Sequence, residues 1–133
     1  MAKEFSFQGK ALKELQELSS EEFAKLLTAR KRRSLKHGID SALLKRVEKA
    51  LKEKNEGKEP KTIRTHKRNA IIIPKFVGLK FAVYNGHEFA ILEVQPEMLG
   101  HMLGEFALTR KRLQHGKAGI GATKSSTAVQ ARG

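Results

Sequence analysis

The stretch LKFAVYNGHEFAILEV, residues 79–94, decides the fold of this chain. Its Asn85-Gly86 pair separates two segments rich in β-branched and aromatic residues, a pattern typical of a β-hairpin with a two-residue type I′ turn. Such a turn pairs Tyr84 with His87. One face of the hairpin then carries the apolar side chains that we expect in the core, which are Leu79, Phe81, Val83, Ala90 and Leu92.

Two helices are predicted upstream of the hairpin. Ser19 and Glu22 form a capping-box pattern, which predicts a helix over residues 20–33. A second helix is expected to follow, with Asp40 or Ser41 as its N-cap. Its apolar side chains recur at helical spacing, at Leu43, Leu44, Val47 and Leu51.

The segment after the hairpin predicts one short helix that covers the sheet. Pro96 suits the first helical position and Gly104 suits the end. No acidic residue follows Glu105, and the remaining chain has few large apolar groups, so we expect it to become ordered only against a partner.

Together these patterns predict an α+β fold with a small antiparallel sheet and packed short helices. We expect an N-terminal helical extension over residues 1–32, a core domain over residues 33–110 and a basic, glycine-rich tail over residues 111–133.

The charge balance indicates a polyanionic partner. The 133 residues include 27 Lys and Arg against 14 Asp and Glu, a net charge of +13. There is no cysteine, which excludes disulfides and thiolate zinc sites. The chain has neither a membrane-spanning apolar run nor a secretory signal in MAKEFSFQGK, so we expect an intracellular protein that does not bind membranes.

Three clusters of cations lie beside turns or the ends of elements, in ARKRRSLKHG, KTIRTHKRN and TRKRLQHGK. Three such uncompensated clusters around a small core favour phosphate contacts over a merely solvated surface. The predicted nucleic-acid-binding residues are Arg30, Lys31, Arg32, Arg33, Lys36, Arg64, Lys67, Arg68, Asn69, His101, Arg110, Lys111, Arg112, His115, Lys117 and Lys124.

No enzyme site is predicted, and no cofactor or metal. In HGKAGIGATKSS, residues 115–126, Gly116 and Gly121 have the spacing of a nucleotide-binding P-loop, but Ala122 stands where the lysine is required. His101 and Glu105 are four residues apart, and without a third ligand nearby a structural hydrogen bond or an RNA contact is favoured over a metal site.

Two nucleic-acid readings remain open from the residues alone. Two helices followed by a hairpin would suit a winged helix-turn-helix protein that binds DNA. The predicted second helix, however, offers no cluster of side chains for reading base edges, and a glycine-rich basic tail suits folded RNA. RNA is therefore favoured.

The stretch NGHEFAILEVQPEMLGHMLGEFALTR resembles the small-subunit ribosomal protein family numbered nineteen in bacteria and fifteen in eukaryotes. The residues that carry the resemblance are Asn85, Gly86, Val94, Gly100, His101, Gly104, Glu105, Phe106, Thr109 and Arg110, with Arg68, Pro74 and Gly78 upstream. The N-terminal segment and the tail differ from the short bacterial form, which indicates an archaeal-type member.

The resemblance implies a structural component of the cytoplasmic ribosome. It places the protein in the head of the small subunit, bound to rRNA beside the neighbouring protein numbered thirteen. It further implies that the C-terminal tail approaches the decoding region and the tRNAs.

Overall fold

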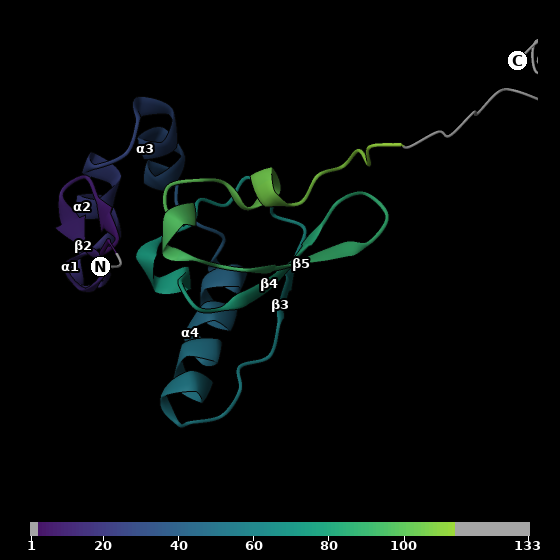
Figure 1. The fold of residues 1–133 in the computed structure, drawn as a ribbon, viewed down its shortest axis with the longest axis horizontal. Helices are drawn as coiled ribbons and strands as arrows, with labels where there is room; N and C mark the ends of the chain where they lie inside the picture. The colour runs from purple at the N-terminus through teal and green to yellow at the C-terminus, as the bar shows by residue number, and fades with distance from the viewer. Residues whose placement is uncertain (1–2, 114–133) are drawn as a thin grey trace, which may run out of the picture.

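Three strands form the central sheet of the computed structural model, which describes residues 3–113. The strands are β3 (Ile63–Thr65), β4 (Lys80–Tyr84) and β5 (Phe89–Glu93), in the order β3-β4-β5 (Figure 1). β5 is antiparallel to β4, as expected, but β3 runs parallel to β4. The α+β class is confirmed. The sheet is mixed rather than antiparallel throughout, because the chain crosses back between β3 and β4 and enters both strands from the same end.

The register of the predicted hairpin differs by two residues. Tyr84 pairs with Phe89 instead of His87. The backbone N–H of Asn85 donates to the carbonyl of Glu88 over 3.0 Å, so the two central residues of the turn are Gly86 and His87. Because side chains alternate with period two, a shift of two residues keeps the same side chains on the core face.

The side chain of Asn85 explains this shift. Its Oδ1 accepts the backbone N–H groups of His87, at 3.2 Å, and of Glu88, at 3.0 Å. Gly86 has a φ of +110°, which glycine adopts without strain. Among the described residues the only positive φ outside glycine is at Gln8, so the two positive φ angles of a type I′ turn are not present here.

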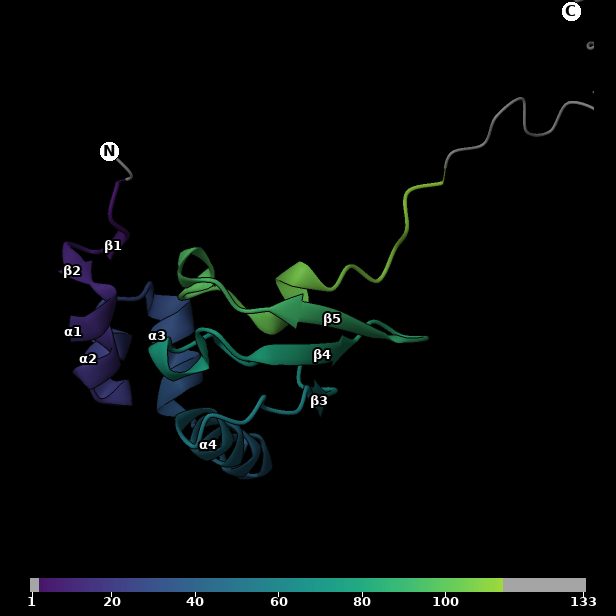
Figure 2. The ribbon, with the colours of Figure 1, turned by 60° about the horizontal axis from the view of Figure 1, so that its bottom comes forward.

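Short helices accompany the sheet, and most of them precede it in the chain. Their bounds are α1 Leu12–Glu17, α2 Ser20–Lys25, α3 Ala29–Lys36 and α4 Ser41–Asn55, with the 3₁₀ helices η1 Pro74–Phe76, η2 Pro96–Met98 and η3 Leu103–Phe106. A small antiparallel pair, β1 (Ser6–Phe7) and β2 (Lys10–Ala11), lies against α1. Figure 2 shows α4 beside β3, with the N-terminal elements grouped apart from the sheet.

The helix predicted over residues 20–33 is two helices. The capping box is present, since the N–H of Glu22 donates to Ser19 Oγ and the N–H of Ser19 donates to Glu22 Oε2. These bonds lower the pKa of the Glu22 carboxyl, the backbone bond from Ser19 most. α2 nevertheless ends at Lys25, and α3 begins after an extended Thr28. The break lets the side chain of Leu27 reach the core, where it is 7% exposed.

One hydrophobic core joins the N-terminal elements to the sheet. Leu15 on α1 and Phe23 on α2 are fully buried in the same cluster as Phe81 and Val83 on β4. The apolar face predicted for α4 is confirmed by the burial of Leu43 and Val47, whereas Leu44 and Leu51 are only partly buried; Ala50 completes the buried face. Leu15, Phe23 and Leu27 of the N-terminal segment thus share one core with the sheet.

The segment after the sheet is two 3₁₀ helices instead of one helix. Pro96 stands at the first position of η2, as expected. Gly104 does not end a helix but lies inside η3, close to the backbone of Arg68. Leu99 and Leu103 are buried.

Candidate nucleic-acid interface

The helix α3 presents cations to solvent. Arg30, Arg33 and Lys36 are exposed, and α3 contains no acidic residue. Within residues 3–113 their side chains form no hydrogen bond or ion pair. A surface groove of about 530 Å³ is lined by Ala29, Arg32, Arg33, Lys36 and His37. Such cations retain their full donor capacity for phosphate oxygens.

Arg32 points the other way, toward the end of α2. Its guanidinium donates to three backbone carbonyls, those of Ala24 at 3.3 Å, Lys25 at 3.4 Å and Leu27 at 3.1 Å. These carbonyls lie at the C-terminus of α2, where a cation complements the helix dipole. Arg32 therefore stabilises the break between α2 and α3.

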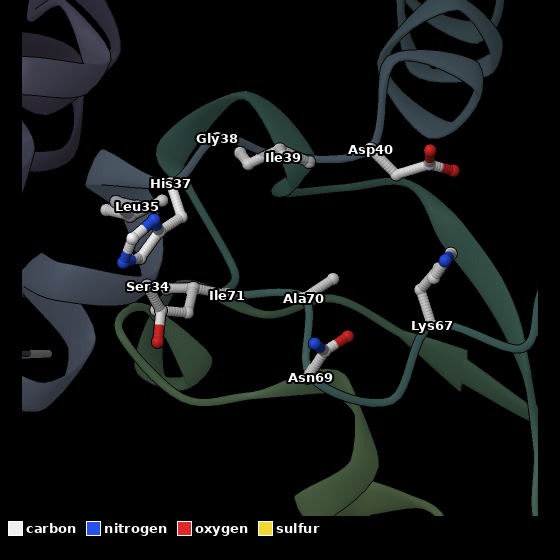
Figure 3. Close-up of a pocket in the computed structure, with 10 residues that line it drawn as sticks. All are labelled: Ser34, Leu35, His37, Gly38, Ile39, Asp40, Lys67, Asn69, Ala70 and Ile71. Atoms are coloured by element: carbon white, nitrogen blue, oxygen red, sulfur yellow. The ribbon is translucent and has the colours of Figure 1, made fainter.

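A cavity brings two of the predicted clusters together. It has a volume of about 470 Å³ and lies between the end of α3 and the segment after β3. Figure 3 shows His37 and Ser34 on one side of the cavity and Lys67 and Asp40 on the other, with Asn69 between them. The segments at residues 29–38 and 61–69 thus meet at this cavity, although the 22 residues 39–60 separate them in the chain.

Two cations lie at β3. The sequence pattern identified Arg64 on the strand itself but missed Arg46 on the neighbouring helix α4. Arg64 is exposed, and its guanidinium lies 5.7 Å from the centre of the Phe89 ring. Arg46 on α4 donates to the backbone carbonyl of Arg64 over 2.7 Å. Arg46 lies among alternating charges on its helix, so the sequence alone does not single it out. The packing of α4 against β3 is what puts it beside Arg64.

Arg68 holds the structure together. Its guanidinium donates to the carbonyls of Tyr84, at 2.9 Å, Gly104, at 2.9 Å, and Ala107, at 2.6 Å. The approach is close, because a Cβ at Gly104 would lie 2.9 Å from the Arg68 Cβ and 3.0 Å from its carbonyl oxygen. Arg68 thus joins the end of β4 to η3. Its role as an rRNA contact stays a prediction.

His101 and Glu105 form the hydrogen bond that their spacing favoured. His101 Nδ1 and Glu105 Oε2 are 2.6 Å apart. Burial by itself raises the pKa of the Glu105 carboxyl, but the bond to His101, a backbone bond at Met102 and the charge of Lys31 together bring that pKa below its usual value.

The remaining candidates lie toward the C-terminus. Arg110, Lys111 and Arg112 are exposed in a segment that runs away from the sheet (Figure 1). His115, Lys117 and Lys124 lie outside the described residues.

Two other classes of site receive no support from residues 3–113. In this range no three histidine, aspartate or glutamate side chains gather where they could hold a metal ion. None of the helices described is long and apolar enough to span a membrane.

Comparison with known proteins gives a consistent result. The profile of the family described as Ribosomal protein S19 matches residues 31–115. The small ribosomal subunit protein uS19 of Saccharolobus solfataricus is 48% identical over 131 residues, which covers 98% of this chain and 94% of that protein. The uS19 protein of Halorubrum lacusprofundi is 50% identical over 127 residues, 96% of this chain and 90% of that protein.

The basic α+β fold and these matches define a ribosomal protein, a structural constituent of the small subunit in the cytoplasmic ribosome and not an enzyme. The chain belongs to the Ribosomal protein S19 family. The archaeal character expected from the N-terminal segment agrees with the two archaeal relatives, whose alignments include most of that segment. This membership favours RNA over the DNA-binding alternative.

Proposed function

We propose that this protein binds small-subunit rRNA through the surface formed by α3 and the segment after β3. The observation that carries the proposal is that the end of α3 and the segment after β3, which belong to two distant basic clusters, line one cavity. Beside it, the exposed side chains of Arg30, Arg33 and Lys36 have no partner among the described residues. Exposed arginines and lysines on a preformed surface neutralise phosphates without a cost of ordering the backbone.

The position of the protein within the small subunit is inferred from its family resemblance. We place the protein in the head of the small subunit, beside the protein numbered thirteen. The segment that begins with Arg110, Lys111 and Arg112 leads away from the folded part, and this direction suits a tail that reaches the decoding region and tRNA. A cross-linking map of purified small subunits that finds the tail peptides far from both would overturn this placement.

The role of α3 is tested with the triple variant Arg30→Ala, Arg33→Ala, Lys36→Ala. We expect weaker binding to deproteinised small-subunit rRNA and a log–log salt dependence shallower by about two, at 0.7 to 0.9 per lost phosphate contact. The measurement is equilibrium binding at several salt concentrations.

The matched control removes three exposed cations from another helix, in the variant Lys45→Ala, Lys49→Ala, Lys52→Ala on α4. An equal change of slope in both variants would mean that only net charge matters and would contradict a specific role for α3. Stronger binding of the wild type to duplex DNA than to the rRNA would overturn the rRNA function itself.

A further inference from the structure

The outer face of the sheet, opposite the core, leaves large apolar side chains exposed, although the small Ala82 in its middle is buried. The cross-strand register places Tyr84 directly opposite Phe89, and Arg64 and Ile91 in the same row on either side of Ala82. Ile91 is 75% exposed and Phe89 is 36% exposed. Phe89 and Ile91 are neighbours on the same face of β5 and so form one apolar patch, which is the kind of surface that marks a contact site.

The aromatic side chains on this face support one another. The ring of His66 lies 4.6 Å from that of Tyr84 and 5.3 Å from that of Phe89, and the Tyr84 and Phe89 rings are 5.2 Å apart. The hydroxyl of Tyr84 donates to the carbonyl of Gly86 over 3.0 Å, which fixes its ring. These contacts hold the Phe89 ring in place before any partner arrives.

The charges on this face favour a nucleic-acid partner over an apolar protein surface. Arg64 lies over the Phe89 ring, and the guanidinium of Arg46 lies beside β3. The acidic residues of the hairpin stand at its two ends, where Glu88 lies 3.5 Å from His87 and Glu93 is opposite Lys80. Between them the face combines π surfaces with cations, and that combination matches a base and its phosphate.

We propose that Arg64, His66, Tyr84, Phe89 and Ile91, which we call the sheet platform, stack an unpaired base of the rRNA. The base lies against the exposed part of the Phe89 ring and the side chain of Ile91, while Arg64 contacts the adjoining phosphate. This inference rests on the proposed rRNA binding and assigns it a second surface. The sheet platform binds an unpaired nucleotide, whereas α3 neutralises phosphates.

The variant Phe89→Leu tests the platform, because it keeps apolar bulk but removes the aromatic ring. We expect its affinity for deproteinised small-subunit rRNA to fall about 5- to 150-fold, the range for one stacked base. The salt slope stays that of the wild type, because no phosphate contact is removed. Phe7→Leu on β1 is the matched control, since Phe7 is a partly buried ring away from the sheet, and thermal unfolding verifies that both variants fold.

Ultraviolet cross-linking supplies an independent result. Irradiation of the wild-type complex, followed by digestion and mass spectrometry, is expected to find a nucleotide attached to His66, Tyr84 or Phe89. Unchanged affinity of Phe89→Leu, with the wild type binding normally, overturns the platform and leaves the rRNA function standing. Protein cross-links in place of nucleotide adducts, in intact small subunits, overturn it in favour of a protein partner. Failure of the wild type to bind the rRNA overturns the proposed function itself.

Discussion

The connection after β3 and the outer face of α3 are both rich in cations, but they use them differently. Arg68 directs its guanidinium inward to three backbone carbonyls that belong to β4, η3 and the residue after η3. Arg33 directs its guanidinium to solvent and has no partner among residues 3–113. Identical side chains in similar basic runs therefore face opposite directions, one toward the backbone of the fold and one toward solvent, where we propose that it binds phosphate.

A charge pattern in the sequence does not tell whether an arginine faces the protein backbone or solvent. RKRR at residues 30–33 contains three exposed arginines, and one of them, Arg32, donates to the carbonyls at the end of α2. A guanidinium carries five donors and can satisfy several carbonyls at once, so a basic run can hold a fold together as readily as it can bind phosphate.

The largest effect is expected from Arg68→Ala. This change leaves three carbonyl groups without their donor, and we expect the free energy of unfolding to fall by about 2–4 kcal/mol. Urea denaturation followed by circular dichroism measures the change. Arg68→Lys keeps the charge but loses the planar fork and is expected to recover less than half of the loss.

A loss below about 1 kcal/mol in Arg68→Ala would contradict the structural role. A smaller salt slope in Arg68→Ala than in the wild type, measured where the variant is still folded, would also contradict a purely structural role, because it would show that the charge of Arg68 serves phosphate binding.

A smaller effect is expected from Arg32→Ala, with Arg33→Ala as its neighbour and control. The bonds of Arg32 are longer and more exposed, so we expect a loss of about 0.5–1.5 kcal/mol in unfolding free energy. Arg33→Ala is expected to change stability by less than about 0.5 kcal/mol and to weaken rRNA binding instead. Equal losses of stability in the two variants would break the distinction between inward and outward arginines.

The smallest effect is expected from Glu105→Gln. The folded state has a lowered pKa for this carboxyl, so its contribution to stability is complete above the unfolded pKa near 4.5 and is lost as the pH falls through the lower folded pKa. We expect Glu105→Gln to reduce the unfolding free energy at pH 7 by about 0.5 kcal/mol, because solvent screens this exposed pair.

The measurement for Glu105→Gln is urea denaturation at pH 7 and at pH 3, with Glu97→Gln as a control on the neighbouring η2. The difference between Glu105→Gln and the wild type should be smaller at pH 3 than at pH 7, because protonation of the carboxyl removes its charge. A difference that persists unchanged at pH 3 would show that the carboxylate charge is not its source.

Much of the fold could be predicted from local patterns. The hairpin, its buried face, the capping box at Ser19 and the proline at the start of η2 all follow from short-range chemistry. The position of the turn could not be predicted, because the side chain of Asn85 accepts two backbone N–H groups. The central pair of the turn moves by one residue, from Asn85-Gly86 to Gly86-His87, and the strand pairing therefore moves by two. The parallel strand β3 was hidden because its three residues lie inside a basic run.

The candidate site divides in the same way. The sequence by itself determined that the chain is cationic, where its basic runs lie and which family it resembles, because these are properties of composition and motif. Only the tertiary structure decided which cations face the backbone and which face solvent. It also placed Arg64, His66 and Phe89 on one exposed face, because contacts between distant strands set the direction of each side chain.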